Sequence, residues 1–137
     1  MIIIDTNVVY SALRSSLGSS FVLLNAMAEG KVDYAISAAL IFEYEDVLKR
    51  PENQLAFNET EIDQILDSIV ALGSHHSSYF LWRPFLKDPK DDMILELAVV
   101  SESDRIVTHN IKDFNGSTKL GVKAVTPLNY LKKEKLL

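Results

Sequence analysis

Four short apolar runs along the chain have the pattern of buried β-strands. They cover Met1 to Ile4, Val32 to Ile36, Arg105 to Thr108 and Val122 to Val125. The first run is apolar at every position, which is typical of a strand covered by helices on both faces. We therefore predict a β-strand in each run, and the first of them ends directly before Asp5.

Segments with apolar residues at helical spacing lie between these runs. Polar residues that favour helix starts precede several of them, and Gly or Pro follows several of them. We expect helices over Phe21 to Glu29, Ser37 to Arg50, Asn58 or Thr60 to Gly73, and Asp91 to about Ser101, and a last one from Pro127. Asp5, Thr6 or Asn7 can cap a further helix after the first strand.

Two other segments are less regular. Ser74 to Leu86 is aromatic and contains the helix breaker Pro84, so we expect an extended or edge segment followed by a loop. Asn110 to Phe114 is expected to form a turn or a short helix. Because strands alternate with helices, the pattern predicts an α/β fold with a parallel sheet that is covered on both faces.

Length and composition fit one globular domain that spans residues 1–137. The chain has 137 residues, of which 47% are hydrophobic and 24% are charged. It contains no cysteine, which excludes disulfides, thiolate metal sites and cysteine nucleophiles. No apolar run is long enough to cross a bilayer, so we expect a soluble cytoplasmic protein without a membrane partner.

The net charge of −5 argues against a protein that grips nucleic acid through a broad basic face. It does not exclude a nuclease, because divalent cations held by several carboxylates would reverse the sign of the charge in one cleft. Candidates for contacts with phosphate, with solvated surface as the alternative role, are Arg14, Arg83, Lys87 and Lys90.

Four carboxylates follow predicted strands or begin predicted helices. Asp5 follows the first strand, and Asp113 follows the strand that ends at Thr108. Glu43 lies near the start of the helix after the second strand, and Asp91 begins a helix. The loops beyond the carboxyl ends of parallel strands face one crevice, so these acids could converge there. Converging carboxylates repel one another unless a cation neutralises them, and oxygen ligands favour Mg²⁺ or Mn²⁺.

Neighbouring residues could complete such a site. Asp92 is a further candidate metal ligand, next to Asp91. Neutral groups suited to orienting ligands and waters come from Thr6, Asn7, Thr108 and Asn110.

Each acid also has a simpler explanation when it is taken alone. Asp5 is a possible helix cap, Asp91 can stabilise the positive end of its helix, and Asp113 can be an ordinary turn residue. Glu43 can be the partner of a surface cation. The prediction of a metal site therefore depends on the four acids occurring together.

Four stretches of the sequence occur in the order of the motifs of one known family. They are IIIDTNVVYSAL, SAALIFEYEDVLKR, DPKDDMILELA and IVTHNIKDF. Together they resemble the PIN domains, a family of small nucleases that includes the VapC-like toxins of toxin–antitoxin pairs. In the third stretch, the spacing to Ile94 and Ala98 favours Asp91 over Asp92 as the family acid. In the fourth, Asn110 stands where many relatives have an aspartate, which leaves Asp113 as the fourth acid.

The resemblance implies a three-layer α/β/α sandwich with a central parallel sheet. It also implies one or two Mg²⁺ or Mn²⁺ ions held by Asp5, Glu43, Asp91 and Asp113 with help from Asp92, and hydrolysis of RNA phosphodiester bonds. A homodimer and a small antitoxin protein that blocks the cleft are the partners that it implies. The alternatives are an RNA-processing nuclease outside a toxin–antitoxin system, a receiver-like signalling domain and a non-catalytic interaction module.

Overall fold

The strands of the protein form a parallel sheet in the computed structural model, which describes residues 1–77 and 85–137. β1 (Ile2–Ile4) pairs with β4 (Arg105–Val107), and β4 pairs with β5 (Lys123–Val125). β2 (Ala35–Ile36) pairs with β3 (Ser74–His75), and a bridge between Ile2 and Tyr34 joins this pair to β1. With this bridge the strand order is β3–β2–β1–β4–β5, and β1 lies at the centre.

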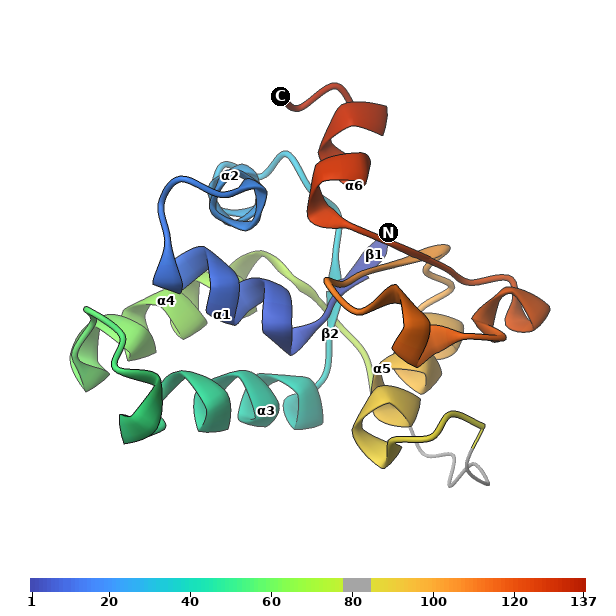
Figure 1. Cartoon of the computed structure of the whole chain (residues 1–137), viewed down its shortest axis with the longest axis horizontal. Coiled ribbons are helices and arrows are strands. Elements are labelled where there is room, and N and C mark those ends of the chain that lie inside the picture. Colours follow the sequence, from blue (N-terminus) through green and yellow to red (C-terminus); the bar gives the residue numbers. More distant parts are fainter. Residues whose placement is uncertain (78–84) are drawn as a thin grey trace.

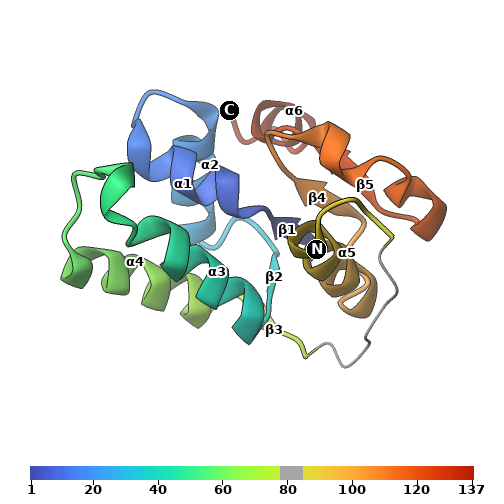
Figure 2. The ribbon, with the colours of Figure 1, turned by 60° about the horizontal axis from the view of Figure 1, so that its bottom comes forward.

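Helices cover both faces of this sheet. They are α1 (Thr6–Arg14), α2 (Ser19–Ala28), α3 (Ala38–Leu48), α4 (Glu59–Leu72), α5 (Pro89–Val100) and α6 (Pro127–Lys133), with short 3-10 helices at Pro51–Asn53, Ile111–Phe114 and Ser117–Leu120. α5 packs on β1, β2 and β4, whereas α1 to α4 pack together on the other side of β2 (Figures 1 and 2). This layering and the parallel sheet confirm the predicted α/β/α class.

The central strand explains why the first apolar run lacks polar alternation. Ile2, Ile3 and Ile4 are each at most 1% exposed, so both faces of β1 are covered. Burying an isoleucine side chain stabilises a fold by roughly 1.5–3 kcal/mol. A shift of the chain by one residue that moved Asp5 into this strand would bury its carboxylate between two apolar faces, so the packing fixes Asp5 at the strand's carboxyl end.

Side-chain caps fix where several helices begin. Ser37 Oγ accepts a hydrogen bond from the backbone N–H of Leu40 at the start of α3, at 3.1 Å. Asn58 and Glu61 form a reciprocal capping box at the start of α4, with distances of 2.8 and 3.0 Å. Because Ser37 sets the first turn of α3, Glu43 falls on the helix next to the end of β2.

Some predicted boundaries differ from the observed ones. The strand predicted over Val32 to Ile36 is only Ala35–Ile36, because Tyr34 makes a single bridge to β1 and nothing longer. The helix predicted from Asp91 begins at Pro89, because Asp88 caps it by accepting from the N–H of Lys90 at 2.9 Å.

Two further predicted segments can be compared with the structure. The helix predicted to reach Arg50 ends at Leu48. Ser74–His75, at the start of the segment predicted to be extended, is the strand β3, and residues 78–84 of that segment lie outside the described residues. Among the helices of the described chain, none combines the length and the apolar character that crossing a membrane requires.

Candidate functional site

Asp5 lies where β1 passes into α1, and it does not act as a side-chain cap. It occupies the N-cap position, but its carboxylate makes no capping hydrogen bond with α1. Its Oδ2 instead accepts the hydroxyl proton of Thr108, at 2.7 Å, across 103 positions of the sequence. Its backbone N–H donates to the carbonyl of Val107 at 2.9 Å. These two bonds fix Asp5 to the end of β4, and the residue is only 7% exposed.

Thr108 is the centre of a small polar network after β4. It is fully buried, and besides donating to Asp5 its Oγ1 accepts the backbone N–H of Asn110 at 3.0 Å. Asn7 Nδ2 also donates to this oxygen, at 3.4 Å, and Asn7 Oδ1 accepts the backbone N–H of His109 at 3.2 Å. These bonds hold the first turn of α1 against the loop after β4 and so align the carboxylate of Asp5.

Glu43 faces the same region from α3. Its side chain is 19% exposed, and its Oε1 lies 3.8 Å from Nζ of Lys90. That distance is longer than a hydrogen bond, so the two groups form a loose ion pair. The sequence offered two roles for Glu43, that of a cleft acid and that of the partner of a surface cation. The structure shows both features, because Glu43 lines the cleft with the other acids and also pairs with Lys90.

Asp91 and Asp92 are neighbours in sequence with different surroundings. Asp91 lines the cleft together with Asp5 and Ile94. Asp92 does not line it: its Oδ1 accepts the backbone N–H groups of Phe85 and Leu86, at 3.2 and 2.8 Å. The Oδ1 of Asp92 thus fastens the segment before α5, and the role of Asp92 as a metal ligand stays a prediction.

The cleft is a hollow of about 250 Å³. Its walls come from the beginnings of α1 and α5, from the middle and last turn of α3, and from the 3-10 helix after β4. Its lining residues are Asp5, Thr6, Asn7, Tyr10, Glu43, Val47, Asp88, Lys90, Asp91, Ile94, Asn110 and Asp113. The structure thus brings together Asp5, Glu43, Asp91 and Asp113, as the sequence predicted.

Negative charges in this cleft disturb one another. Burial, and then the charges of Asp5 and Asp113, raise the pKa of Asp91 from its ordinary 3.8 to about 7. Burial also raises the pKa of Asp5, opposed by its hydrogen bond from Thr108 and reinforced by the charges of Asp113 and Glu43. The cleft therefore favours a bound proton or a bound cation over a set of bare carboxylates.

The chemistry of the cleft fits a hard divalent cation. All its candidate ligands are oxygens, and the hydroxyl Oγ1 of Thr6 is buried there without a hydrogen-bond partner. Among residues 1–77 and 85–137, no three Asp, Glu or His side chains are close enough together to enclose a metal ion. Mg²⁺ binds proteins through one or two carboxylates and keeps several waters, so this wider spacing is compatible with it.

The predicted phosphate contacts divide into three cases. Lys90 lines the cleft. Arg14 instead lines a separate hollow beside Glu52 and Asn53, and Lys87 is exposed outside the cleft lining. Arg83 lies outside the described residues. Only Lys90 of the three described cations is therefore placed to meet a ligand in the cleft.

Sequence reasoning missed some residues of this region. Tyr10 and Asp88 line the cleft but were not candidates. The helical spacing from Asn7 to Tyr10 could have indicated the first, and the acid directly before Pro89 the second. Ser20 was not a candidate either, yet it is buried and its Oγ lies 2.7 Å from Nε2 of His109. No local pattern points to that contact, because the two residues are 89 positions apart.

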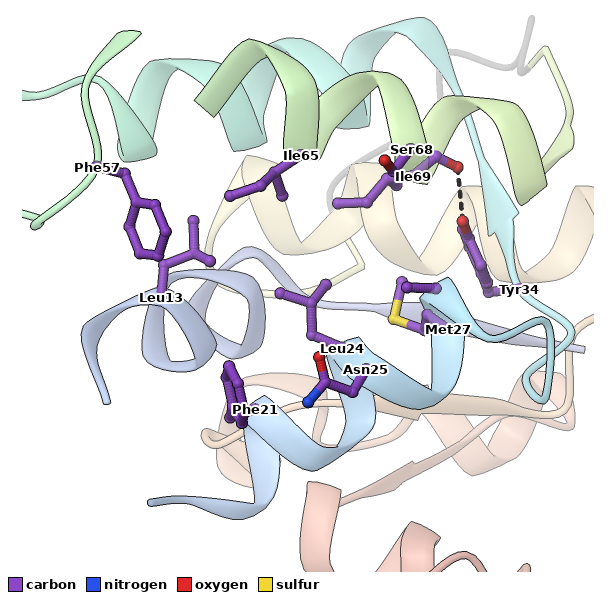
Figure 3. A pocket seen from close by; sticks show the side chains of 11 residues that line it. Leu13, Phe21, Leu24, Asn25, Met27, Tyr34, Phe57, Ile65, Ser68 and Ile69 are labelled. Atoms are coloured by element: carbon purple, nitrogen blue, oxygen red, sulfur yellow. Dashed lines mark hydrogen bonds between the residues drawn. The ribbon is translucent and has the colours of Figure 1, made fainter. Parts of the chain in front are cut away.

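A second hollow, of about 230 Å³, lies between α1, α2 and α4 (Figure 3). Leu13, Phe21, Met27 and Ile69 are among its lining residues, and none of them carries a carboxylate. Tyr34, at its end, donates its hydroxyl proton to the carbonyl of Ile69 at 2.6 Å (Figure 3). This hollow has the composition of an incompletely filled core, so the charged chemistry belongs to the acidic cleft.

A comparison with protein families finds one match. The family model described as PIN domain matches residues 1–112 of the chain. The matched range includes Asp5, Glu43 and Asp91 and ends one residue before Asp113. No curated protein and no solved structure matches the chain.

Proposed function

The chain belongs to the PIN domain family, and on that premise we propose that it is a Mg²⁺- or Mn²⁺-dependent endoribonuclease. PIN domains are typically nucleases, and they generally use divalent metals. The observation that supports the proposal most is the gathering of Asp5, Glu43, Asp91 and Asp113 around one cleft, where the pKa of Asp91 rises to about 7. The family match also favours a nuclease over a receiver-like domain.

In this proposal the carboxylates of the cleft hold the cation, and the neutral groups around them orient them. A bound divalent cation supplies Lewis-acid stabilisation of the phosphate and a more acidic water. Asp5 is kept in place by Thr108, and Thr6 offers a hydroxyl without another partner. The net reaction adds the oxygen of a water molecule to phosphorus, breaks one phosphorus–oxygen bond to a sugar, and leaves a proton on the sugar oxygen.

The test compares two variants that remove the same charge. Asp5→Asn alters the cleft, whereas Asp67→Asn alters an exposed acid of α4 outside it. We expect the purified wild-type chain and Asp67→Asn to cleave a labelled single-stranded RNA with Mg²⁺ or Mn²⁺ and to stop with a chelator. Asp5→Asn should fold, as judged by circular dichroism, and should not cleave. Undiminished cleavage by folded Asp5→Asn would reject the proposed site.

The biological role that we propose is that of the toxin in a toxin–antitoxin pair. The resemblance of the four motifs to the VapC-like members of the family is its support, and it brings with it a small antitoxin protein, a homodimer and a cytoplasmic location. Expression of the chain in bacteria should arrest growth, and expression of Asp5→Asn should not. Unimpaired growth together with RNA cleavage in vitro would favour an RNA-processing nuclease instead, and loss of both would favour an interaction module.

A further inference from the structure

Lys90 is the only cation that lines the acidic cleft among the described residues. The same cleft is lined by Asp5, Glu43, Asp88, Asp91 and Asp113. An RNA phosphate that enters this cleft meets strong negative charge, and a nearby ammonium group would offset part of it. The position of Lys90 therefore bears directly on how the cleft accepts an anionic substrate.

The backbone of Lys90 is fixed, but its side chain is not. Its N–H donates to Oδ1 of Asp88 at 2.9 Å, which anchors the first turn of α5. Its Nζ lies 3.8 Å from Oε1 of Glu43, and the side chain is 59% exposed. An ion pair that is this long and this exposed is weak, so the ammonium group can leave Glu43 at little cost.

The place of Lys90 in α5 is unfavourable for the helix itself. It occupies the second residue of α5, where the helix dipole disfavours a positive charge. Charge stabilisation of the helix does not explain a lysine there, whereas the acids of the cleft do. Its removal should accordingly leave the fold intact.

We propose that Lys90 exchanges partners in the cleft: it neutralises Glu43 in the free protein and contacts an RNA phosphate once a divalent cation has taken Glu43. The inference rests on the proposed function, because it assumes that both RNA and a divalent cation enter this cleft. Lys90 then has two opposed effects. It competes with the cation for Glu43 in the absence of RNA, and it strengthens the binding of RNA.

Lys90→Gln separates these two effects, with Lys119→Gln as the matched control. Lys119 is an exposed lysine outside the cleft lining, so its loss changes the net charge equally. Calorimetric titration of the RNA-free proteins with Mn²⁺ should give about two- to fivefold tighter binding for Lys90→Gln, the range set by loss of one exposed ion pair. Lys119→Gln should bind Mn²⁺ as the wild type does.

RNA binding is measured by fluorescence anisotropy of a labelled single-stranded RNA with Ca²⁺, over a range of salt concentrations. Lys90→Gln should bind the RNA more weakly, and the slope of log affinity against log salt should fall by about 0.7, the value for one phosphate contact on a single strand. Lys90→Arg should restore both, because the charge is kept. A lysine that only supported the fold would not change the salt slope.

Three results would overturn the exchange. They are unchanged Mn²⁺ affinity in Lys90→Gln, weaker Mn²⁺ binding in that variant, and a salt slope equal to that of Lys119→Gln. If the wild type binds no Mn²⁺, both the exchange and the metal site are wrong. If the wild type binds Mn²⁺ and RNA as described but cleaves nothing, the nuclease proposal fails while the partner exchange stands.

Discussion

Asp91 and Asp92 should change stability in opposite directions when each is replaced by asparagine. Both lie in the first turn of α5, so each variant loses the same favourable interaction with the helix dipole. The difference between the two variants then reports their other surroundings. Asp91 is disfavoured as an anion by burial and then by the charges of Asp5 and Asp113, whereas Asp92 accepts two backbone N–H groups.

The sign for Asp91 follows from its pKa of about 7 in the folded protein, which is above the ordinary 3.8. Stability is lost as the pH rises from about 4 through 7, because the folded protein must then release a proton that it holds tightly. A shift of this size corresponds to about 4 kcal/mol if it is fully expressed. Asp91 is partly exposed and screened by solvent, so we expect Asp91→Asn to gain about 1–2 kcal/mol at pH 8 and little at pH 4.

Asp92→Asn should lose stability at the same pH. An asparagine can still accept the N–H groups of Phe85 and Leu86, but hydrogen bonds to a charged acceptor are roughly twice as strong as those to a neutral one. We expect a loss of about 1–2 kcal/mol, and Leu86, which is 7% exposed, should become more accessible.

The assay is urea unfolding of wild type, Asp91→Asn and Asp92→Asn at pH 8 and pH 4, in low salt without added metal. At pH 8 the two variants should differ by about 2–4 kcal/mol, the sum of the opposite effects. Added Mn²⁺ should stabilise the wild type more than Asp91→Asn, because a ligand stabilises the state that binds it. If Asp91→Asn is no more stable than the wild type at pH 8, the repulsion inferred for the cleft is absent.

Two other substitutions test the support of the site. Thr108→Val keeps the shape of the side chain but removes the 2.7 Å bond to Asp5, so Mn²⁺ affinity measured by calorimetry should fall about 10-fold or more, and Thr108→Ser should keep most of it. If Thr108→Val binds Mn²⁺ as tightly as the wild type, the hydrogen bond from Thr108 to Asp5 does not contribute to metal binding. Tyr44→Phe removes the 2.5 Å bond from a buried hydroxyl to the carbonyl of Ile4 at the end of β1, and urea unfolding should show a loss of about 1–3 kcal/mol. A loss of stability within experimental error would mean that the hydrogen bond from Tyr44 to this carbonyl does not stabilise the fold.

Those parts of the fold and of the site that depend on a local pattern of residues could be predicted from the sequence. β1 and β4 were found because strands covered on both faces are apolar at nearly every residue. Asp5 and Asp113 could be brought together in advance, because the carboxyl ends of parallel strands meet at one edge of a sheet. The spacing to Ile94 also favoured Asp91 over its neighbour, in agreement with the observed cleft lining.

The rest depends on contacts that no local pattern contains. Asp92 turns to the N–H groups of Phe85 and Leu86 because the chain before α5 folds back over the helix start. Lys90 meets Glu43 from a distant part of the chain, and only the packing of α3 beside α5 creates that pair. Helix spacing gives the face on which a side chain lies, but it does not give the neighbour on another element.

The polar support of the cleft is formed by hydrogen bonds among backbone groups and neutral side chains, none of which includes a candidate metal ligand beyond Asp5. Asp5 donates its N–H to Val107, and Thr108 donates its N–H to Val125, which ties both strand ends into the sheet. Metal sites that create their own fold lack such bonds before the ion binds. Here burial of Asp91 and then the charges of Asp5 and Asp113 oppose the assembly of the acids, as the raised pKa of Asp91 indicates. Binding of a cation should therefore stabilise a preformed cleft, and neutral variants of its acids should fold.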